Sequence, residues 1–248
     1  MDAFLQSIYE FDLSVFSAIF SIANDVLDHI MFWVTKLGDG MIMPIVGVIL
    51  LFFKKTRKAG MAMLGALLVM VILNNEILKP MIARVRPCFI FDPVALEANK
   101  AELGSKFDKI LATVNEYAQR FPELKAKWIE GYKFPEIGYP NLAEKLPFIA
   151  SELTHTMPHS WSFPSGHTSS SFAFATAVFA NNKKWGIAAY VLAALIGFSR
   201  IYLGVHYCTD VLAGAVLGIV YGVIGVLVVG AIIKLIKKKD NKLSKLFD

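Results

Sequence analysis

Charge is scarce in this chain of 248 residues, because Asp, Glu, Lys and Arg together make up 18% of it. Soluble domains carry roughly a quarter of their residues as these four types. Cysteine is rarer still, with two residues, too few for the disulfide framework of a small secreted protein. The N-terminus lacks the basic segment and the small-residue cleavage site of a signal peptide. These absences argue against a soluble domain and a disulfide-held scaffold, and we expect the first apolar segment to be retained.

In place of charge the chain has long apolar segments, and 56% of its residues are hydrophobic. These segments alternate with short charged stretches, a pattern typical of membrane proteins with several helical spans. We therefore predict an all-α fold: a polytopic membrane helical bundle of about six transmembrane helices, forming a single domain over residues 1–248. The predicted segments are 13–36, 40–53, 59–79, 165–181, 185–203 and 207–234. The first contains several polar residues and is interpreted as broken or partly interfacial.

Clusters of lysine and arginine follow the second, fourth and sixth of these segments. With six crossings, all three clusters fall on one side of the membrane, which the positive-inside rule identifies as the cytoplasm. The sequence thus predicts an integral protein of the bacterial plasma membrane with both termini in the cytoplasm. These clusters account for the net charge of +5, so membrane and lipid are the expected partners and nucleic acid is not.

One large hydrophilic stretch, residues 88–163, interrupts the apolar pattern and falls on the outer side. Within it, apolar residues recur at spacings of three and four, which predicts an amphipathic helix. These residues are Leu103, Phe107, Ile110, Leu111, Val114, Tyr117 and Phe121. Such a helix would lie on the outer leaflet, or it would cap a site and select lipids. The spacing leaves both interpretations open.

Three clusters of polar residues lie near the outer ends of the apolar segments, where charge is costly unless it is paired or functional. In the third cluster, His206 and Asp210 are four residues apart and share a helix face. The carboxylate can then fix the imidazole tautomer and leave the other nitrogen free as a nucleophile. A purely structural pair is the alternative. Arg200, before a turn with Gly204, favours the functional interpretation because it can point back over His206 and clamp an anion.

The second cluster is Pro164-Ser165-Gly166-His167, at the start of a predicted segment. Ser165 is expected at the N-cap, which leaves the backbone N–H groups of Gly166 and His167 free to bind an anion. Glycine lets a phosphate approach the backbone closely, and His167 can donate a proton. An ordinary helix start is the alternative, since Ser-Gly turns begin many helices.

The first cluster supplies Lys79 and Arg86, which are seven residues apart. They lie on roughly one helix face if the helix continues past Pro80. Pro87 is expected to end that helix. Snorkelling of long cationic side chains to the membrane surface is the alternative, and it suits Arg84 best.

Together, the three clusters resemble the three-part signature of the type 2 phosphatidic acid phosphatase family. The matching strings are Lys79-x6-Arg86-Pro87, Pro164-Ser165-Gly166-His167 and Ser199-Arg200-x5-His206-x3-Asp210. All signature positions match, and the resemblance extends from the third predicted segment to the sixth. The six-span layout resembles the integral-membrane branch of the family, although the stretch 88–163 is longer than expected for its small bacterial members.

The resemblance implies a role for each signature residue. His206 would attack phosphorus and form a phosphohistidine, Asp210 would orient it, and His167 would protonate the leaving oxygen and then help to activate water. The remaining residues would hold the phosphate oxygens as charge develops: Lys79, Arg86, Ser165, Gly166 and Arg200. Three fixed cations would take the place of a metal ion, so we expect no metal and no cofactor.

The sequence therefore predicts a metal-independent lipid phosphatase with its active site at the outer face. The substrate would be a phosphomonoester or diphosphate of a lipid, such as undecaprenyl diphosphate or a phosphatidate-like lipid, although no residue identifies the tail. A lipid phosphotransferase with a non-water acceptor is one alternative. A transporter or non-catalytic membrane scaffold is another, and the gathering of polar residues at one face argues against it.

Three further features each have two interpretations. Cys88 and Cys208 could form a disulfide near the outer site, or pack as small apolar residues. The Asn-Asn-Glu run at 74–76 could make interhelical hydrogen bonds or support Lys79. The Gly-Asp-Gly run at 38–40 is predicted to form a tight outer turn between the first two segments, near the site or away from it.

Overall fold

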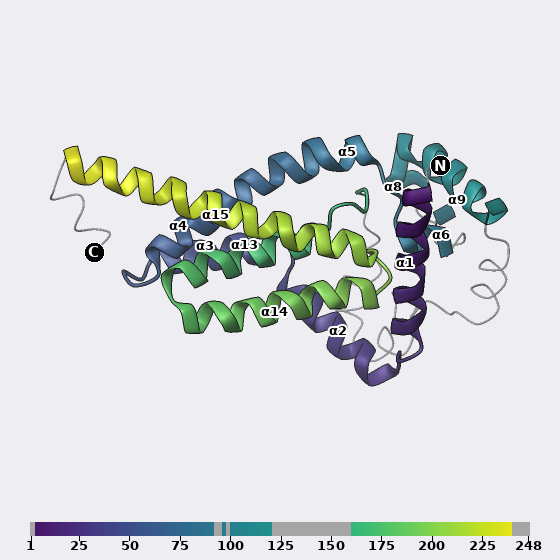
Figure 1. Cartoon of the computed structure of the whole chain (residues 1–248), viewed down its shortest axis with the longest axis horizontal. Coiled ribbons are helices and arrows are strands. Elements are labelled where there is room, and N and C mark those ends of the chain that lie inside the picture. The colour runs from purple at the N-terminus through teal and green to yellow at the C-terminus, as the bar shows by residue number, and fades with distance from the viewer. Residues whose placement is uncertain (1–2, 92–95, 98–99, 121–159, 240–248) are drawn as a thin grey trace.

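The computed structural model describes residues 3–91, 96–97, 100–120 and 160–239, and every regular element in this part of the chain is a helix (Figure 1). The elements up to residue 82 are α1 (Ala3–Phe20), α2 (Asp25–Leu37), α3 (Ile42–Leu51), α4 (Arg57–Met70), the π-helix η1 (Val71–Leu78) and α5 (Lys79–Ile82). The later elements are α6 (Pro87–Phe91), α8 (Lys100–Leu103), the 3-10 turn η2 (Gly104–Lys106), α9 (Phe107–Arg120), α13 (Gly166–Asn181), α14 (Lys183–Tyr202) and α15 (Cys208–Lys239). The predicted all-α fold is confirmed.

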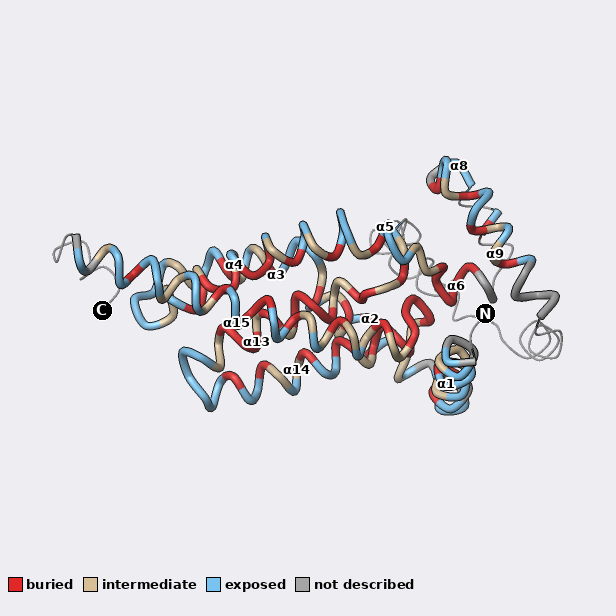
Figure 2. The backbone as a smooth tube through the Cα atoms, turned by 45° about the horizontal axis from the view of Figure 1, so that its top comes forward, coloured by how far each residue is buried: buried red, intermediate tan, exposed pale blue. Residues whose placement is uncertain are grey.

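The centre of the bundle is α13, which packs against α4, α14 and α15. Buried residues concentrate where these four helices meet, and exposed residues lie on the outer faces (Figure 2). Many of the exposed outer residues are large and apolar, such as Trp185, Val216 and Leu227. An apolar exterior around a packed interior is what a helix bundle needs in a bilayer, because lipid tails are its solvent.

A stripe of glycines presses α15 onto α13. A Cβ added at Gly214 would lie 2.8 Å from the carbonyl oxygen of Ser165, and one at Gly218 would lie 2.4 Å from that of Ser169. At Gly222 the added atom would meet Thr176 Cβ at 2.5 Å. Small residues at this spacing allow two membrane helices to approach backbone to backbone, so a side chain at any of these positions would force the helices apart.

Three helical stretches in the described residues are long and apolar enough to cross a membrane: Arg57–Phe89, Lys183–Tyr202 and Cys208–Ile236. The bent pair Val26–Leu37 and Ile42–Leu51 makes a fourth if it is taken as one span, with a 51° bend between its parts. The protein is therefore an integral membrane protein. The predicted count of six spans is not confirmed and stays a prediction.

The first predicted segment, 13–36, is two helices and not one. α1 ends at Phe20, and Asn24 caps α2 by accepting a 3.0 Å hydrogen bond from the Leu27 N–H. An asparagine N-cap satisfies the free N–H groups of a new helix, so the polar residues mark its beginning. The predicted break is thus confirmed, and the run 38–40 lies between α2 and α3 within the bent pair.

α1 lies across the end of the bundle near α6 and α9, whereas α15 finishes at the opposite end (Figure 1). Asp12 of α1 accepts hydrogen bonds from Thr209, in the first turn of α15, which fixes α1 at that end. The expectation that both termini lie on the cytoplasmic side of the membrane stays a prediction.

The helix that carries Lys79 ends before Arg86, so the prediction that Pro87 ends it is wrong. Ala83 has the left-handed φ of 49° and closes α5, and Pro87 instead begins α6. Proline suits the first position of a helix because its missing N–H would have no partner there. Lys79 and Arg86 therefore do not share one helix face, and an irregular stretch brings Arg86 to the site.

The amphipathic helix predicted in the hydrophilic stretch is confirmed over its described part. Leu103, Phe107, Ile110 and Val114 are buried in one apolar cluster with Val85, Cys88 and Phe89, and Trp161 packs against it. The side chain of Tyr117 and all of Phe121 lie outside the described residues. Cys88 belongs to this cluster while Cys208 packs in another with Phe16 and Tyr202, and both cysteines are free thiols.

Candidate functional site

The third polar cluster is built by the turn between α14 and α15. Gly204 adopts a φ of 68°, which a residue with a side chain rarely does, and reverses the chain. The backbone N–H of His206 then reaches the carbonyl oxygen of Arg200 at 3.2 Å. The turn thus brings His206 back beside the backbone of Arg200, and both residues line one cavity, described below.

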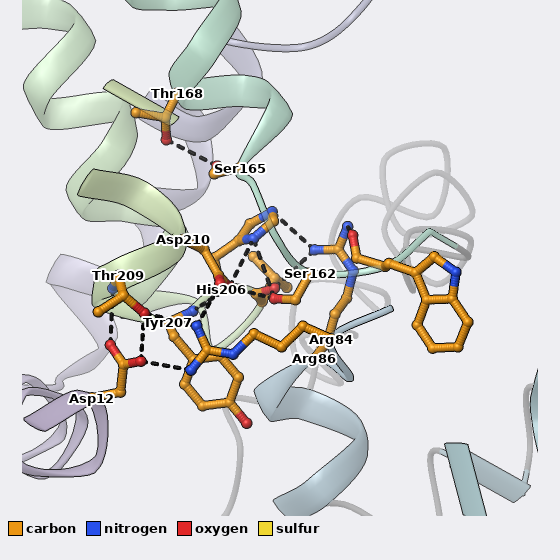
Figure 3. A network of polar contacts seen from close by, with 12 residues as sticks. Asp12, Arg84, Arg86, Ser162, Ser165, Thr168, His206, Tyr207, Thr209 and Asp210 are labelled. Carbon is orange, nitrogen blue, oxygen red and sulfur yellow. Dashed lines mark hydrogen bonds and ion pairs between the residues drawn. The ribbon is translucent and has the colours of Figure 1, made fainter. Parts of the chain in front are cut away.

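The imidazole of His206 has Arg86 on one side. Its Nε2 lies 2.9 Å from Arg86 Nη1 (Figure 3). A guanidinium can only donate hydrogen bonds, so Nε2 must accept, and in the neutral ring the proton sits on Nδ1. This contact selects the tautomer in which Nε2 carries the reactive lone pair.

The other side of the imidazole faces Asp210 and Ser162 (Figure 3). His206 Nδ1 lies 3.5 Å from Asp210 Oδ2 and 3.4 Å from Ser162 Oγ. The Ser162 hydroxyl donates a 2.5 Å hydrogen bond to Asp210 Oδ2. The predicted histidine–aspartate pair is therefore brought together, with the hydroxyl of Ser162 beside the two as a link that sequence reasoning missed.

Electrostatics keep His206 uncharged. Its pKa lies well below the ordinary value of 6.5, mainly because burial penalises the charged ring and also because of the positive charges of Arg86, Arg200 and Lys79. The ring is therefore neutral at pH 7, the state in which Nε2 can act as a nucleophile.

A cavity of about 280 Å³ lies beside this imidazole. Six of the residues predicted from the sequence line it: Lys79, Arg86, Gly166, His167, Arg200 and His206. Apolar residues of α3, α4 and η1 form part of the wall, among them Met43, Leu67 and Met70. The cavity thus joins a cationic, histidine-containing region to an apolar one.

Two predicted residues stand behind the cavity wall. Ser165 occupies the N-cap of α13 as predicted, but its hydroxyl makes no capping bond; it accepts from the Thr168 hydroxyl at 2.9 Å. Its backbone N–H donates to the carbonyl oxygen of Asp210 at 3.1 Å. Ser165 and Asp210 are both fully buried. Neither lines the cavity, and Ser165 instead ties the start of α13 to the start of α15.

Residues 160–162 form a strap that holds Arg86. The guanidinium donates to the Ser160 carbonyl oxygen at 2.7 Å, to the Ser160 hydroxyl at 2.9 Å and to the Val205 carbonyl oxygen at 2.8 Å. Lys79 Nζ also reaches the Ser160 hydroxyl, at 3.4 Å. Trp161 anchors the strap in the apolar cluster of α9. Nothing in the sequence pattern around Ser160 indicated this role.

Arg200, the third cation that lines the cavity, is bound by a residue of α2. Arg200 Nη1 donates to the Thr35 hydroxyl at 2.7 Å, and both residues are buried. Arg200 Nε has no hydrogen-bond partner among the described residues. A buried N–H without a partner is costly, and an anion in the adjoining cavity would supply one.

Arg84 is paired and does not snorkel, so that alternative is wrong for it. It donates from Nη1 to Asp210 Oδ1 at 2.7 Å and from Nη2 to Asp12 Oδ2 at 2.6 Å (Figure 3). Its guanidinium also stacks 4.0 Å from the centre of the Tyr207 ring. Sequence reasoning missed Asp12 entirely, and a carboxylate within an otherwise apolar helix was the available signal.

The runs 74–76 and 38–40, each with two predicted interpretations, contribute to helix packing and to the cavity wall. Asn74 bridges helices by donating to Ser169 at 3.0 Å and accepting from Tyr221 at 2.7 Å, which confirms interhelical hydrogen bonding. Asn75 lines the cavity. Gly38 and Gly40 line it as well, so the run 38–40 is near the site.

The structure is thus a membrane helix bundle that places two histidines and three cations around one cavity, an arrangement suited to binding an anion. The sequence model of the PAP2 superfamily matches residues 59–234. This chain belongs to the PAP2 superfamily.

Individual relatives are similar over different lengths. The undecaprenyl-diphosphatase BcrC of Bacillus subtilis is 40% identical over 81 residues, which cover 32% of this chain and 42% of that protein. The lipid A 4'-phosphatase of Porphyromonas gingivalis is 24% identical over 224 residues, 88% of this chain and 72% of that one. Phosphatidylglycerophosphatase B of Bacillus subtilis is 28% identical over 216 residues, 84% and 78% respectively. The chain therefore aligns with less than half the length of the first of these relatives.

Two solved structures share the fold. The PAP2-type phosphatidylglycerolphosphate phosphatase of Bacillus subtilis matches with a TM-score of 0.54 and 23% identity, covering 88% of this chain and 84% of that one. LpxE of Aquifex aeolicus matches with a TM-score of 0.51 and 22% identity, covering 86% and 93%. At these identities the likeness supports the fold alone.

Proposed function

We propose that this protein is a lipid phosphatase that hydrolyses a phosphomonoester or diphosphate of a membrane lipid through a phosphohistidine at His206. The observation that carries the proposal is the neutral His206 ring with its Nε2 on Arg86 Nη1, 2.9 Å away, beside a cavity that also contains Lys79, Arg200 and His167. Membership of the superfamily supports it, as do relatives named as undecaprenyl-diphosphatase, lipid A phosphatase and phosphatidylglycerophosphatase.

Substrate binding needs an exchange of hydrogen bonds. Arg86 Nη1 transfers its hydrogen bond from His206 Nε2 to a phosphate oxygen, and this leaves the lone pair free to face phosphorus. Lys79 and Arg200 neutralise the remaining oxygens, and the buried Nε of Arg200 gains its partner. The backbone N–H of Gly166 at the start of α13 adds a further donor. Preorganised donors of this kind stabilise the transition state without reorganising during the reaction.

The reaction then takes two steps. In the first, His206 Nε2 forms a bond to phosphorus and the bond from phosphorus to the lipid or leaving phosphate oxygen breaks. His167, which is protonated in the substrate complex because the phosphate anion lies beside it, gives that oxygen a proton. The positive charge that develops on His206 is stabilised at Nδ1 by Asp210 and Ser162. In the second, water attacks the phosphohistidine, gives a proton to His167 and releases inorganic phosphate, which restores both histidines.

We propose that no metal and no cofactor takes part, because three fixed cations provide the charge that a metal ion would otherwise supply. Lys79, Arg86 and Arg200 all line the cavity. Their combined charge matches that of a phosphoryl group and its leaving oxygen. Activity should therefore persist in EDTA.

We propose that the site faces the outer side of a bacterial plasma membrane. The connection before α4, with Lys54 and Lys55, lies beside the corner between α13 and α14, because Asn181 donates to the Lys55 carbonyl oxygen at 2.9 Å. The basic end of α15 finishes at the same end of the bundle (Figure 1). The positive-inside rule identifies this end as cytoplasmic, so the opposite end, with the site and the insertion 88–163 of the single domain, lies outside.

The substrate class follows from the two halves of the cavity. Its cations suit a phosphate or diphosphate headgroup, and its apolar wall of Met43, Leu67 and Met70 suits the adjoining part of a lipid tail. Undecaprenyl diphosphate and phosphatidate-like lipids are the substrates to test first.

The test is phosphate release from farnesyl diphosphate and short-chain phosphatidate in detergent with EDTA. Wild type should release phosphate without an added acceptor, and His206→Ala should lose at least about 10⁴-fold in kcat/KM, as expected when a nucleophile is removed. His29→Ala, an exposed histidine of α2, is the matched control and should retain activity. A phosphoryl label on the wild-type protein that is labile to acid and stable to base would identify the phosphohistidine.

Equal activity of wild type and His206→Ala would end the proposal. Phosphate release only in the presence of an acceptor alcohol would instead identify a phosphotransferase. No turnover of any lipid phosphate by the folded protein would favour the transporter or scaffold alternative.

A further inference from the structure

A buried three-residue ion cluster lies behind the site, and the proposed reaction uses only one of its members, Asp210, directly. Arg84 stands between Asp12 of α1 and Asp210 of α15, with N–O distances of 2.6 and 2.7 Å. Both carboxylate side chains are fully buried, and the Arg84 side chain is 9% exposed. A pair of buried carboxylates repel each other unless a cation bridges them, so the three residues depend on one another.

Arg84 fixes which face of Asp210 is available. Its Nη1 binds Oδ1, while Oδ2 accepts from the Ser162 hydroxyl at 2.5 Å and from the Tyr207 N–H at 2.9 Å. Oδ2 is also the oxygen that lies near His206 Nδ1. The guanidinium therefore holds Asp210 in the one orientation that serves the imidazole.

Asp12 in turn holds Arg84 and the start of α15. Its Oδ1 accepts from the Thr209 N–H at 2.8 Å, and its Oδ2 accepts from the Thr209 hydroxyl at 2.6 Å. Thr209 is in the first turn of α15, where backbone N–H groups have no partner within the helix and a negative charge is favourable. Asp12 thus caps, from a separate helix, the turn that carries Asp210.

We infer that Asp12 and Arg84 are positioning residues for the reaction, acting on His206 through Asp210. On this inference α1 contributes to the active site, although Asp12 lies before the stretch that matches the superfamily. Arg84 and Arg86, two residues apart, reach opposite sides of the same imidazole: Arg86 binds Nε2 directly, and Arg84 acts on the Nδ1 side through the carboxylate.

The inference rests on the proposed function, and steady-state kinetics on the full chain in detergent test it. Arg84→Met should lower kcat about 100-fold, the cost of misplacing a catalytic group by about 1 Å, with KM nearly unchanged because Arg84 does not line the large cavity. Arg84→Lys keeps the charge but not the two-pronged contact, and should lose about 10-fold. Asp12→Asn should also lose about 10-fold, because Arg84 loses its anchor.

The pH profile separates positioning from simple damage to the fold. The acid limb of kcat/KM reports protonation of His206, which is faced by Lys79, Arg86, His167, Arg200 and Asp210. Without Arg84 the negative charge of Asp210 acts undiminished on the ring, so Arg84→Met should move this limb up by about 0.5 pH unit. Asp12→Asn removes a negative charge and should move it down. Loss of structure alone would lower the profile without moving its limbs in opposite directions.

Matched controls lie away from the site. Arg57→Met removes a guanidinium at the start of α4, at the opposite end of that helix from the site, which donates to the Leu51 carbonyl oxygen. Asp108→Asn alters an exposed carboxylate of α9. Both should keep the wild-type kcat and acid limb. Wild-type kcat in Arg84→Met, or a raised KM with unchanged kcat, would overturn the inference. If His206→Ala is inactive in the same assay, that result leaves the proposed function intact, whereas full activity of His206→Ala would reject the function itself.

Discussion

The regions before and after residue 59 contribute to the site in different ways. The later region supplies every group proposed to touch phosphate, including His167, Arg200 and His206. The earlier region supplies Asp12 and Thr35, which bind Arg84 and Arg200 from behind, and glycines that line the cavity. The groups proposed to meet phosphate thus all come from the later region, whereas the groups that hold them come from both regions: Asp12 and Thr35 from the earlier one, Ser160 and Ser162 from the later one.

The largest effect is expected at Arg86, which is proposed to meet phosphate and is itself bound to His206 and to the strap 160–162. Arg86→Met should lower kcat/KM about 10³-fold, since it removes a preorganised donor and leaves the Ser160 carbonyl oxygen without its partner. Arg86→Lys should recover part of this loss, because a point charge cannot make the same set of contacts. Phosphate release measures both, and Arg57→Met is the control.

A smaller effect is expected at Ser162, a holding residue that lies in the later region. Ser162→Ala removes the hydroxyl between Asp210 and His206 and should lower kcat about 30-fold, or roughly 2 kcal/mol for a hydrogen bond to a charged group. KM should hardly change. Ser14→Ala, an exposed serine of α1, is the matched control. An unaltered kcat would mean that Asp210 serves the ring without the hydroxyl.

Thr35 offers the sharpest test of the earlier region. Thr35→Val preserves shape but removes the hydroxyl that accepts from Arg200 at 2.7 Å. Arg200 keeps its charge, so we expect about a fivefold rise in KM, the worth of one hydrogen bond of roughly 1 kcal/mol. Thr113→Val on α9 should have no such effect. A large fall in kcat with constant KM would instead place Arg200 in the chemical step alone.

The smallest expected effect is on stability and concerns His206 itself. Its folded pKa is below 6.5, so the unfolded chain binds more protons as the pH falls below 6.5. The stability contributed by the neutral ring is fully present above pH 6.5 and is lost below it, by at most about 1.4 kcal/mol per pH unit. Thermal unfolding of wild type and His206→Gln at pH 7.5 and 5.5 measures this contribution, as the difference between the two proteins in the stability lost on acidification. Equal losses in both proteins would contradict it.

Much of the site could be predicted because its chemistry demands particular residue types at fixed spacings. His206 and Asp210 are one helical turn apart, and Ser165 to His167 begin a helix, so local geometry alone brings each group together. Six of the eight predicted residues line one cavity. The helical fold followed from the apolar segments in the same way.

The rest depends on long-range packing that spacing does not encode. Asp12 meets Arg84 across 72 positions of chain because Phe16 and Ile19 dock α1 onto the cluster that contains Tyr202. Nothing in the sequence distinguishes Ser162 from other loop serines, because only the folded strap 160–162 brings it to Asp210. Pro87 starts a helix as readily as it follows one, so the sequence could not distinguish the two.

The glycine stripe of α15 has a consequence for how the protein responds to its bilayer. His167 is the second residue of α13, and His206 lies two residues before α15. The two helices meet at Gly214, Gly218 and Gly222 without room for a methyl group. Neither helix can slide or tilt independently of the other. Stretching or thinning of the surrounding lipid should therefore be absorbed elsewhere, so we expect the spacing between His167 and His206 to stay the same in membranes of different thickness.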